Sequence, residues 1–128
     1  MRDILLGFTS PPTPLLQRGG SREDETLPIP VVVTRVVALE LERLYNHLWT
    51  LGALANDVGQ SFILNGFLAV REQILDLNQA IFGSRTLQGV ITFGGVKKIL
   101  SSDDGVSILQ TLASIEPRLL NLIDMCKR

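Results

Sequence analysis

The chain has 128 residues, which suits one domain, with 45% hydrophobic residues, 5% aromatic residues and a formal net charge of −1. The near-neutral charge excludes a broad electrostatic grip on nucleic acid or on an anionic membrane surface. The single cysteine, Cys126, excludes an intrachain disulfide and a metal site built from cysteines alone. We expect it to be a small apolar side chain near a helix end.

Neither a membrane span nor a targeting segment is evident. No stretch reaches about 18 uninterrupted apolar residues, so the sequence predicts no transmembrane helix and no direct membrane insertion. Residues 1–8 are too short and too acidic for a signal peptide. The expected compartment is therefore the cytoplasm.

The first 28 residues differ in composition from the rest. Residues 10–14 contain three prolines, which cannot hold a helix, and residues 18–25 are polar and contain two glycines. We interpret residues 1–28 as an extended or disordered proline-rich lead and residues 29–128 as the body. The break in composition also allows a second hypothesis, that residues 1–25 are foreign sequence fused upstream.

Two long helices are predicted next, over about residues 31–58 and 61–82. Apolar residues recur in steps of three and four, the repeat of a helical packing face. In the first helix they are Val37, Leu41, Leu44, Leu48, Leu51, Ala55 and Val58, and in the second Ile63, Phe67, Val70, Ile74, Leu77 and Ile81. Gly83 is a C-terminal stop signal. The sequence leaves open whether the helices break at Gly59 or continue through a kink.

Residues 84–96 hold β-branched residues and three glycines, which predicts an irregular or extended segment with room for one short strand, ending in a turn at Gly94-Gly95. A third helix is expected from near Ser102, whose hydroxyl can cap it. Two acidic residues follow, where the helix dipole favours them. The apolar positions of this helix are Ile108, Leu112, Ile115, Leu119, Leu122 and Cys126.

Pro117 lies inside this third region. The helix either kinks there, or stops and restarts with Ser114 as a cap. The apolar residues of all three segments recur with the same helical spacing, and no sheet is convincing. The sequence therefore predicts an all-α, up-down bundle of three long helices, with residues 84–96 as a short irregular or extended connection.

Motifs for catalysis are scarce. The chain has no glycine-rich phosphate loop, no paired cysteine motif and no nucleophile elbow. Glu40, Arg43 and His47 share one helix face. They are either a proton-handling or ion-paired cluster, or a solvated face, or a polar edge that pairs with another chain.

Three stretches together carry a resemblance to a known family. They are RVVALELERLYNHLWTLGALANDVG (35–59), FLAVREQILDLNQAIFGSR (67–85) and GVITFGGV (89–96). In that order they resemble the large subunit of membrane-bound, energy-converting nickel–iron hydrogenases. The 49-kDa quinone-site subunit of respiratory complex I, an NADH–quinone oxidoreductase, belongs to the same family. The resemblance covers about residues 27–128 and implies an internal fragment of a longer subunit.

The resemblance also implies what is missing. Hydrogenase members bind nickel and iron through two C-x-x-C pairs, and this sequence has neither, so we expect no cofactor in this chain. The expected partners are the other subunits of a membrane-associated hydrogenase-like or complex I-like assembly, notably a small subunit that holds an iron–sulfur cluster. Such partners would place the chain peripherally on a membrane.

Three residues inherit candidate roles from the resemblance. Asp57 corresponds to an aspartate that faces the quinone cavity in the complex I branch, and Arg85 and His47 are the next redox-cavity candidates. Leu87 replaces the histidine that the complex I branch places near its terminal cluster, which favours the hydrogenase branch. Phe93 replaces a proline usual in both branches.

Two functions follow as hypotheses. In the first, the chain is part of the helical scaffold around the redox or quinone site of a hydrogenase-like or NADH–quinone oxidoreductase-like subunit, and is expected to be inactive when isolated. In the second, it is a non-catalytic helical module that docks on a partner subunit or forms a homo-oligomer, because three apolar seams on a short chain leave apolar surface exposed.

Overall fold

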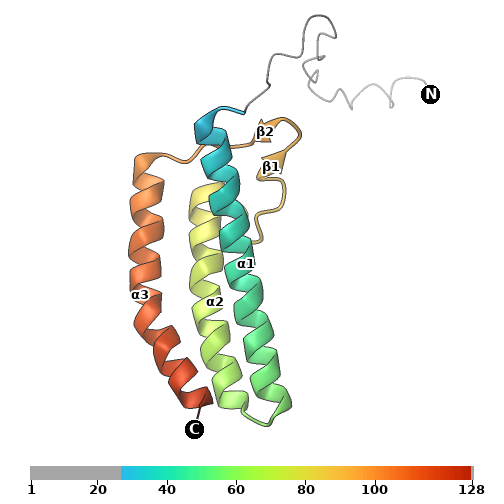
Figure 1. Cartoon of the computed structure of the whole chain (residues 1–128), viewed down its shortest axis with the longest axis vertical. Helices are drawn as coiled ribbons and strands as arrows, with labels where there is room; N and C mark the ends of the chain where they lie inside the picture. The colour runs from blue at the N-terminus through green and yellow to red at the C-terminus, as the bar shows by residue number, and fades with distance from the viewer. Residues whose placement is uncertain (1–26, 128) are drawn as a thin grey trace, which may run out of the picture.

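Three helices and one small hairpin make up the fold. The computed structural model describes residues 27–127. The helices are α1 (Ile29–Asp57), α2 (Ser61–Phe82) and α3 (Ser102–Cys126), and the hairpin is β1 (Ile91–Thr92) with β2 (Gly95–Val96). Successive helices alternate in direction, so that α1 and α3 point the same way, as Figure 1 shows. The predicted all-α bundle with a short extended segment is confirmed.

A tight turn separates α1 from α2, so the two helices are not continuous. Gly59 has a φ of 84°, in the left-handed region. Its N–H donates to the carbonyl of Asn56, and the N–H of Gln60 donates to the carbonyl of Ala55, both at 2.9 Å. This pair of bonds is a Schellman motif, which satisfies the last carbonyls of α1 and reverses the chain.

Helix α2 is the centre of the bundle, since both other helices pack on it. It begins and ends where the sequence predicts, and Gly83 closes it with a φ of 71°. All six of its predicted apolar positions are buried. A helix that packs on both sides needs this broad apolar surface.

Helix α1 buries a face that only partly coincides with the one its large apolar residues predict, since Leu41, Leu48 and Ala55 are buried as predicted. The buried side includes Thr34, Ala38, Tyr45 and Gly52, whereas Leu51 is 45% exposed. Small residues lie at this contact because the helices approach closely. A Cβ on Gly52 would stand 3.0 Å from Leu64 Cδ1. The predicted seam of α1 is therefore correct only in part.

The connection between α2 and α3 contains a true hairpin, where the sequence predicted at most one strand. Ile91 pairs with Val96 and Thr92 with Gly95, antiparallel. The turn lies at residues 93–94, one position earlier than predicted, because Gly94 takes the positive φ of 76° and Gly95 joins β2.

Helix α3 is capped by Ser101 and not by Ser102, which is its first helical residue. The Ser101 hydroxyl accepts from the Asp104 N–H at 3.1 Å, and the Asp104 carboxylate accepts from the Ser101 N–H at 2.9 Å. This reciprocal pair is a capping box. The helix continues through Pro117, and its lower half bends in Figure 1.

No helix within residues 27–127 is long and apolar enough to cross a membrane. The predicted lead at residues 1–28 lies outside the described residues except for its last two, Leu27 and Pro28, which precede α1 without being helical.

Candidate functional site

Arg85 lies just beyond the end of α2 and folds back along it. Its guanidinium forms ion pairs with Glu72 and Asp76, which are one turn apart on the exposed face of α2. The hydrogen bond that the guanidinium donates to Asp76, together with the one it donates to Glu72, raises the pKa of Arg85 above its ordinary value. The side chain is 43% exposed, so a cation is held at a defined place on the surface.

The backbone of the same turn is anchored from inside the bundle. Asn78, which is fully buried, donates from Nδ2 to the carbonyl of Arg85 at 3.1 Å. The Tyr45 hydroxyl on α1 donates to the carbonyl of Thr86 at 3.2 Å. Leu87 then takes a φ of 60° with its side chain buried. Left-handed backbone is costly for leucine, so the surrounding contacts must hold it there.

Arg71 forms the second cationic feature, one that the sequence patterns did not predict. Its guanidinium carbon lies 5.6 Å from the ring centroid of Tyr45 and 5.7 Å from that of Trp49, in cation–π range. Burial, reinforced by Glu42 and opposed by Arg71, raises the pKa of Tyr45. The available signal in the sequence was the spacing of Tyr45 and Trp49, which are four residues apart and so place two aromatic rings on one helix face.

Asp57 and Arg85 lie near opposite ends of α2. Asp57 is the last residue of α1, exposed beside the Gly59 turn, and His47 is exposed along the same helix. Arg85 follows the other end of α2, a helix of 22 residues and thus about 33 Å long. The structure therefore does not bring Asp57 and Arg85 into one small site with His47.

The polar face of Glu40, Arg43 and His47 contains one ion pair. Arg43 Nη1 lies 3.2 Å from Glu40 Oε1, with both side chains more than half exposed. Exposed pairs of this kind contribute little to stability. This face is solvated within residues 27–127.

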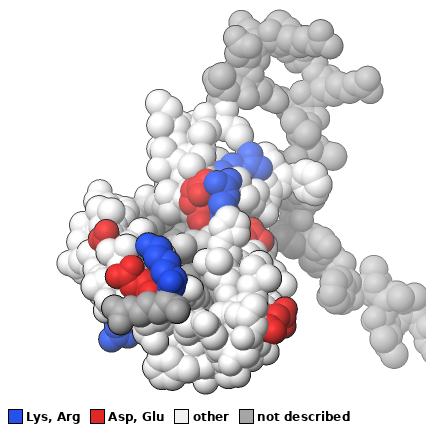
Figure 2. All heavy atoms as spheres, turned by 60° about the horizontal axis from the view of Figure 1, so that its bottom comes forward, with Lys and Arg blue, Asp and Glu red and all other residues white. Residues whose placement is uncertain are grey.

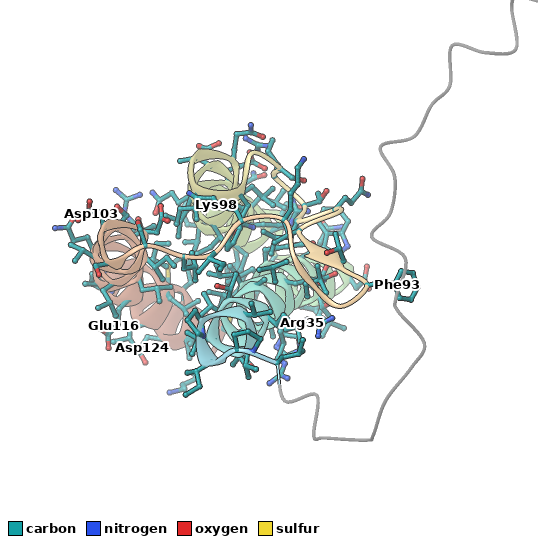
Figure 3. The ribbon with its side chains drawn as sticks, turned by 90° about the horizontal axis from the view of Figure 1, so that it is seen from above. Arg35, Phe93, Lys98, Asp103, Glu116 and Asp124 are labelled. Atoms are coloured by element: carbon teal, nitrogen blue, oxygen red, sulfur yellow. The ribbon has the colours of Figure 1, made fainter. Side chains whose placement is uncertain are left out.

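The hairpin presents Phe93 at its tip, fully exposed and pointing away from the helices in Figure 3. Beneath it, Arg35 of α1 donates to the carbonyl of Thr92 at 3.3 Å. Arg35, Ile91 and the turn line a shallow hollow of about 320 Å³. The hairpin that carries the Phe93 ring is therefore attached to α1 through this hydrogen bond.

Charges of both signs are mixed over the surface. Figure 2 shows blue and red side chains next to one another on a face that is otherwise uncharged. Across residues 27–127, no three His, Cys, Asp or Glu side chains are grouped so that they could hold a metal ion.

The chain is similar to several hydrogenase and NADH-quinone oxidoreductase subunits. It is 36% identical over 64 residues to membrane-bound hydrogenase subunit alpha of Pyrococcus furiosus, covering 50% of this chain and 15% of the relative. It is 36% identical over 85 residues to the D-type subunit of NADH-quinone oxidoreductase from Thermosipho melanesiensis, covering 66% and 23%. With formate hydrogenlyase subunit 5 of Escherichia coli the identity is 29% over 91 residues, covering 71% and 16%.

These matches define the extent of the likeness. The chain spans less than a quarter of the length of these three relatives. No family model matches it, and no solved structure matches it. The resemblance predicted from the motifs is confirmed: this chain is similar to one segment of the hydrogenase large subunits and of the corresponding NADH-quinone oxidoreductase subunit.

Proposed function

We propose that residues 27–127 are part of the helical scaffold beside the redox or quinone site of a hydrogenase-like or NADH–quinone oxidoreductase-like large subunit. In this proposal the chain holds no metal and docks on a small subunit that contains an iron–sulfur cluster. The observation that carries it is the similarity to two kinds of redox subunit over as many as 91 residues.

The anchored turn after α2 gives the docking proposal a physical basis. Arg85 is fixed by two carboxylates on one side, and its backbone is fixed by Asn78 on the other. A cation that is already ordered loses little side-chain entropy when a partner binds. Arg85 is therefore the residue we assign to the contact with the iron–sulfur subunit.

Asp57 and His47 are assigned to the quinone or redox cavity at a separate place. Both are exposed within the described residues and able to face a cavity completed by other segments. Asp57 lies beside the start of α2, whereas Arg85 follows the other end of that helix.

Binding to an isolated iron–sulfur subunit of a membrane-bound hydrogenase tests the docking proposal. The full chain should bind, and Arg85→Ala should weaken binding while Arg118→Ala, an exposed arginine of α3, should not. Absence of binding at high micromolar concentration would overturn the docking role. Stoichiometric nickel in the purified chain, measured by elemental analysis, would overturn the claim that it holds no metal.

The second function that an observation favours is a non-catalytic helical module that docks on a partner or on itself. Its basis is the large apolar side chains that α1 and α3 expose, among them Leu51, Leu54, Leu109 and Leu120. The module would bind its partner equally well after Arg85→Ala, whereas the redox scaffold would not.

A further inference from the structure

The tip of the β1–β2 hairpin exposes an aromatic ring beside a hollow. Phe93 is fully exposed and points away from the three helices in Figure 3. Next to it, Arg35, Ile91 and Gly94 help to line the hollow of about 320 Å³. Burying a phenylalanine side chain is worth about 1.5–3 kcal/mol. An apolar group that covers this ring therefore gains a favourable contact.

The hollow is held in shape by hydrogen bonds on both sides of the hairpin. The two strands pair antiparallel, and the N–H of Lys97 donates to the carbonyl of Val90 at 2.9 Å. Arg35 Nη2 donates to the carbonyl of Thr92 at 3.3 Å, which joins the hairpin to α1. An ordered site loses less conformational entropy on binding than a mobile one. The hairpin is therefore ready to receive an occupant.

Two cations border the hairpin. Arg35 lies at the edge of the hollow, and Lys97 is exposed directly after β2. Among residues 27–127, neither forms an ion pair. An acidic segment that approaches the hairpin would therefore meet uncompensated positive charge.

The segment that precedes α1 has the complementary chemistry. Residues 10–14 read SPPTP, and we call residues 11–14 the proline cluster. Residues 23–25 read EDE, and we call them the acidic run. Clustered prolines favour the polyproline II helix, which binds aromatic side chains and has little conformational entropy left to lose. The lead thus offers prolines for the ring and carboxylates for the cations.

The lead is long enough and joins the bundle at the correct end. In Figure 1 the hairpin lies beside the first turns of α1, the end at which Leu27 precedes the helix. Arg35 is six residues after Ile29, which is about 9 Å along α1. An extended chain spans up to about 13 Å from residue 25 to residue 29, and up to about 50 Å from residue 14. Both parts of the lead can therefore reach the hairpin.

We infer that residues 11–25 dock on the hairpin of the same chain, with the proline cluster on the ring of Phe93 and the acidic run beside Arg35 and Lys97. Because the lead is tethered, its effective concentration at the hairpin is on the order of millimolar, so a weak contact is still populated. This inference goes beyond both functions proposed above. It assigns the lead a binding site on the domain, and a partner that uses Phe93 must first displace it.

Paramagnetic relaxation in NMR spectra of the full chain tests this inference. A nitroxide is attached at Ser10→Cys, next to the proline cluster, in a chain that also carries Cys126→Ser. The expected result is a loss of amide signal intensity over residues 91–96 and none at Gly59, in the turn at the other end of α1. No loss at the hairpin, or a loss centred elsewhere on the bundle, would overturn the inference.

Two phenylalanine variants test the role of the ring. Phe93→Ala should abolish the loss of intensity at the hairpin. Phe62→Ala is the matched control, because Phe62 is also exposed (73%) but lies in the first turn of α2, and it should leave the loss unchanged. Circular dichroism checks that both variants remain helical. A loss that persists in Phe93→Ala would show that the ring is not the binding site.

Salt and isotope mixing complete the test. Raising the salt concentration from about 0.1 M to about 1 M shortens the Debye length from about 10 Å to about 3 Å and should weaken the loss of intensity. An effect independent of salt would remove the acidic run from the contact. When a nitroxide-bearing chain is mixed with a ¹⁵N-labelled chain that has no nitroxide, a loss in the second would show docking between copies and overturn the inference. Binding of an iron–sulfur subunit is measured separately, so the two proposals fail independently.

Discussion

The Asn78 carboxamide lies within 3.1 Å of the Arg85 carbonyl, so a fully buried side chain of α2 holds the turn that follows that helix. The backbone of Arg85 is thereby tied to the core while its guanidinium is tied to the surface by Glu72 and Asp76. Arg85 is therefore held at both its backbone and its side chain, and the position of its guanidinium depends on both attachments.

Replacing Asn78 tests the inner attachment. Asn78→Ala removes the hydrogen bond and leaves a small cavity, and we expect the free energy of unfolding to fall by about 1–2 kcal/mol. Asn65→Ala, on the exposed side of the same helix, is the control and should change it by less than about 0.5 kcal/mol. Urea denaturation measures both, and equal effects would contradict the anchoring role.

Two glycine-to-alanine substitutions should have opposite signs. Gly59→Ala forces a side chain into a φ of 84° and should lower the free energy of unfolding by about 1 kcal/mol. Gly105→Ala lies within α3, where a Cβ meets nothing within 4 Å, and should raise it by about 0.5–1 kcal/mol. Thermal melts compare the stabilities of the two variants. A Gly59→Ala variant more stable than the parent chain would show that the turn does not require a positive φ at this position.

The capping box should make α3 sensitive to acid. The hydrogen bond from the Ser101 backbone, then that from its hydroxyl and the Lys98 cation, lower the pKa of Asp104. A lowered pKa in the folded state contributes stability above the unfolded value, near 3.9. That contribution is lost as the pH falls through the folded pKa. Asp104→Asn should flatten the fall in melting temperature below about pH 4.

Asp103→Asn is the control for that experiment, because the carboxylate of Asp103 is not part of the capping box. It removes the same charge from the same helix turn. If both variants reduce the fall in melting temperature at low pH equally, the net charge and not the capping box explains the pH dependence.

The stacking of Arg71 can be followed through Trp49, the single tryptophan of the chain. Arg71→Met keeps a long apolar side chain but removes the cation, and should cost about 0.5–1 kcal/mol of stability. It should also shift the emission of Trp49 because the charge over the ring is gone. Arg118→Met serves as the control, and an unchanged spectrum in Arg71→Met would contradict the contact.

The accuracy of prediction from sequence differed between α1 and α2 for a physical reason. Helix α2 contacts neighbours on two sides, so its large apolar residues had to be buried and their period located them. Helix α1 contacts α2 through small residues such as Ala38 and Gly52, and hydrophobicity alone gives these no weight. Its larger residues were interpreted as the seam although Leu51 and Val58 stay exposed.

The candidate site was predictable only where neighbours in sequence define it. The family resemblance identified Asp57, Arg85 and His47 as candidates, and their roles stay predictions. The partners of Arg85 required the fold, since Asn78 and Tyr45 reach its turn from two different helices. A contact between residues 41 positions apart, as for Tyr45 and Thr86, leaves no local pattern.

The hydroxyl of Thr34 has a consequence for the order of folding. It donates to the Pro30 carbonyl at 2.8 Å and accepts from the N–H of Leu100 at 3.1 Å, joining positions 66 residues apart. The second bond can form only after α1, α2 and the connection to α3 have closed a long loop, which costs entropy at every step. The amide of Leu100 should therefore gain protection from hydrogen exchange late in refolding, and it marks the moment at which the chain becomes one cooperative unit.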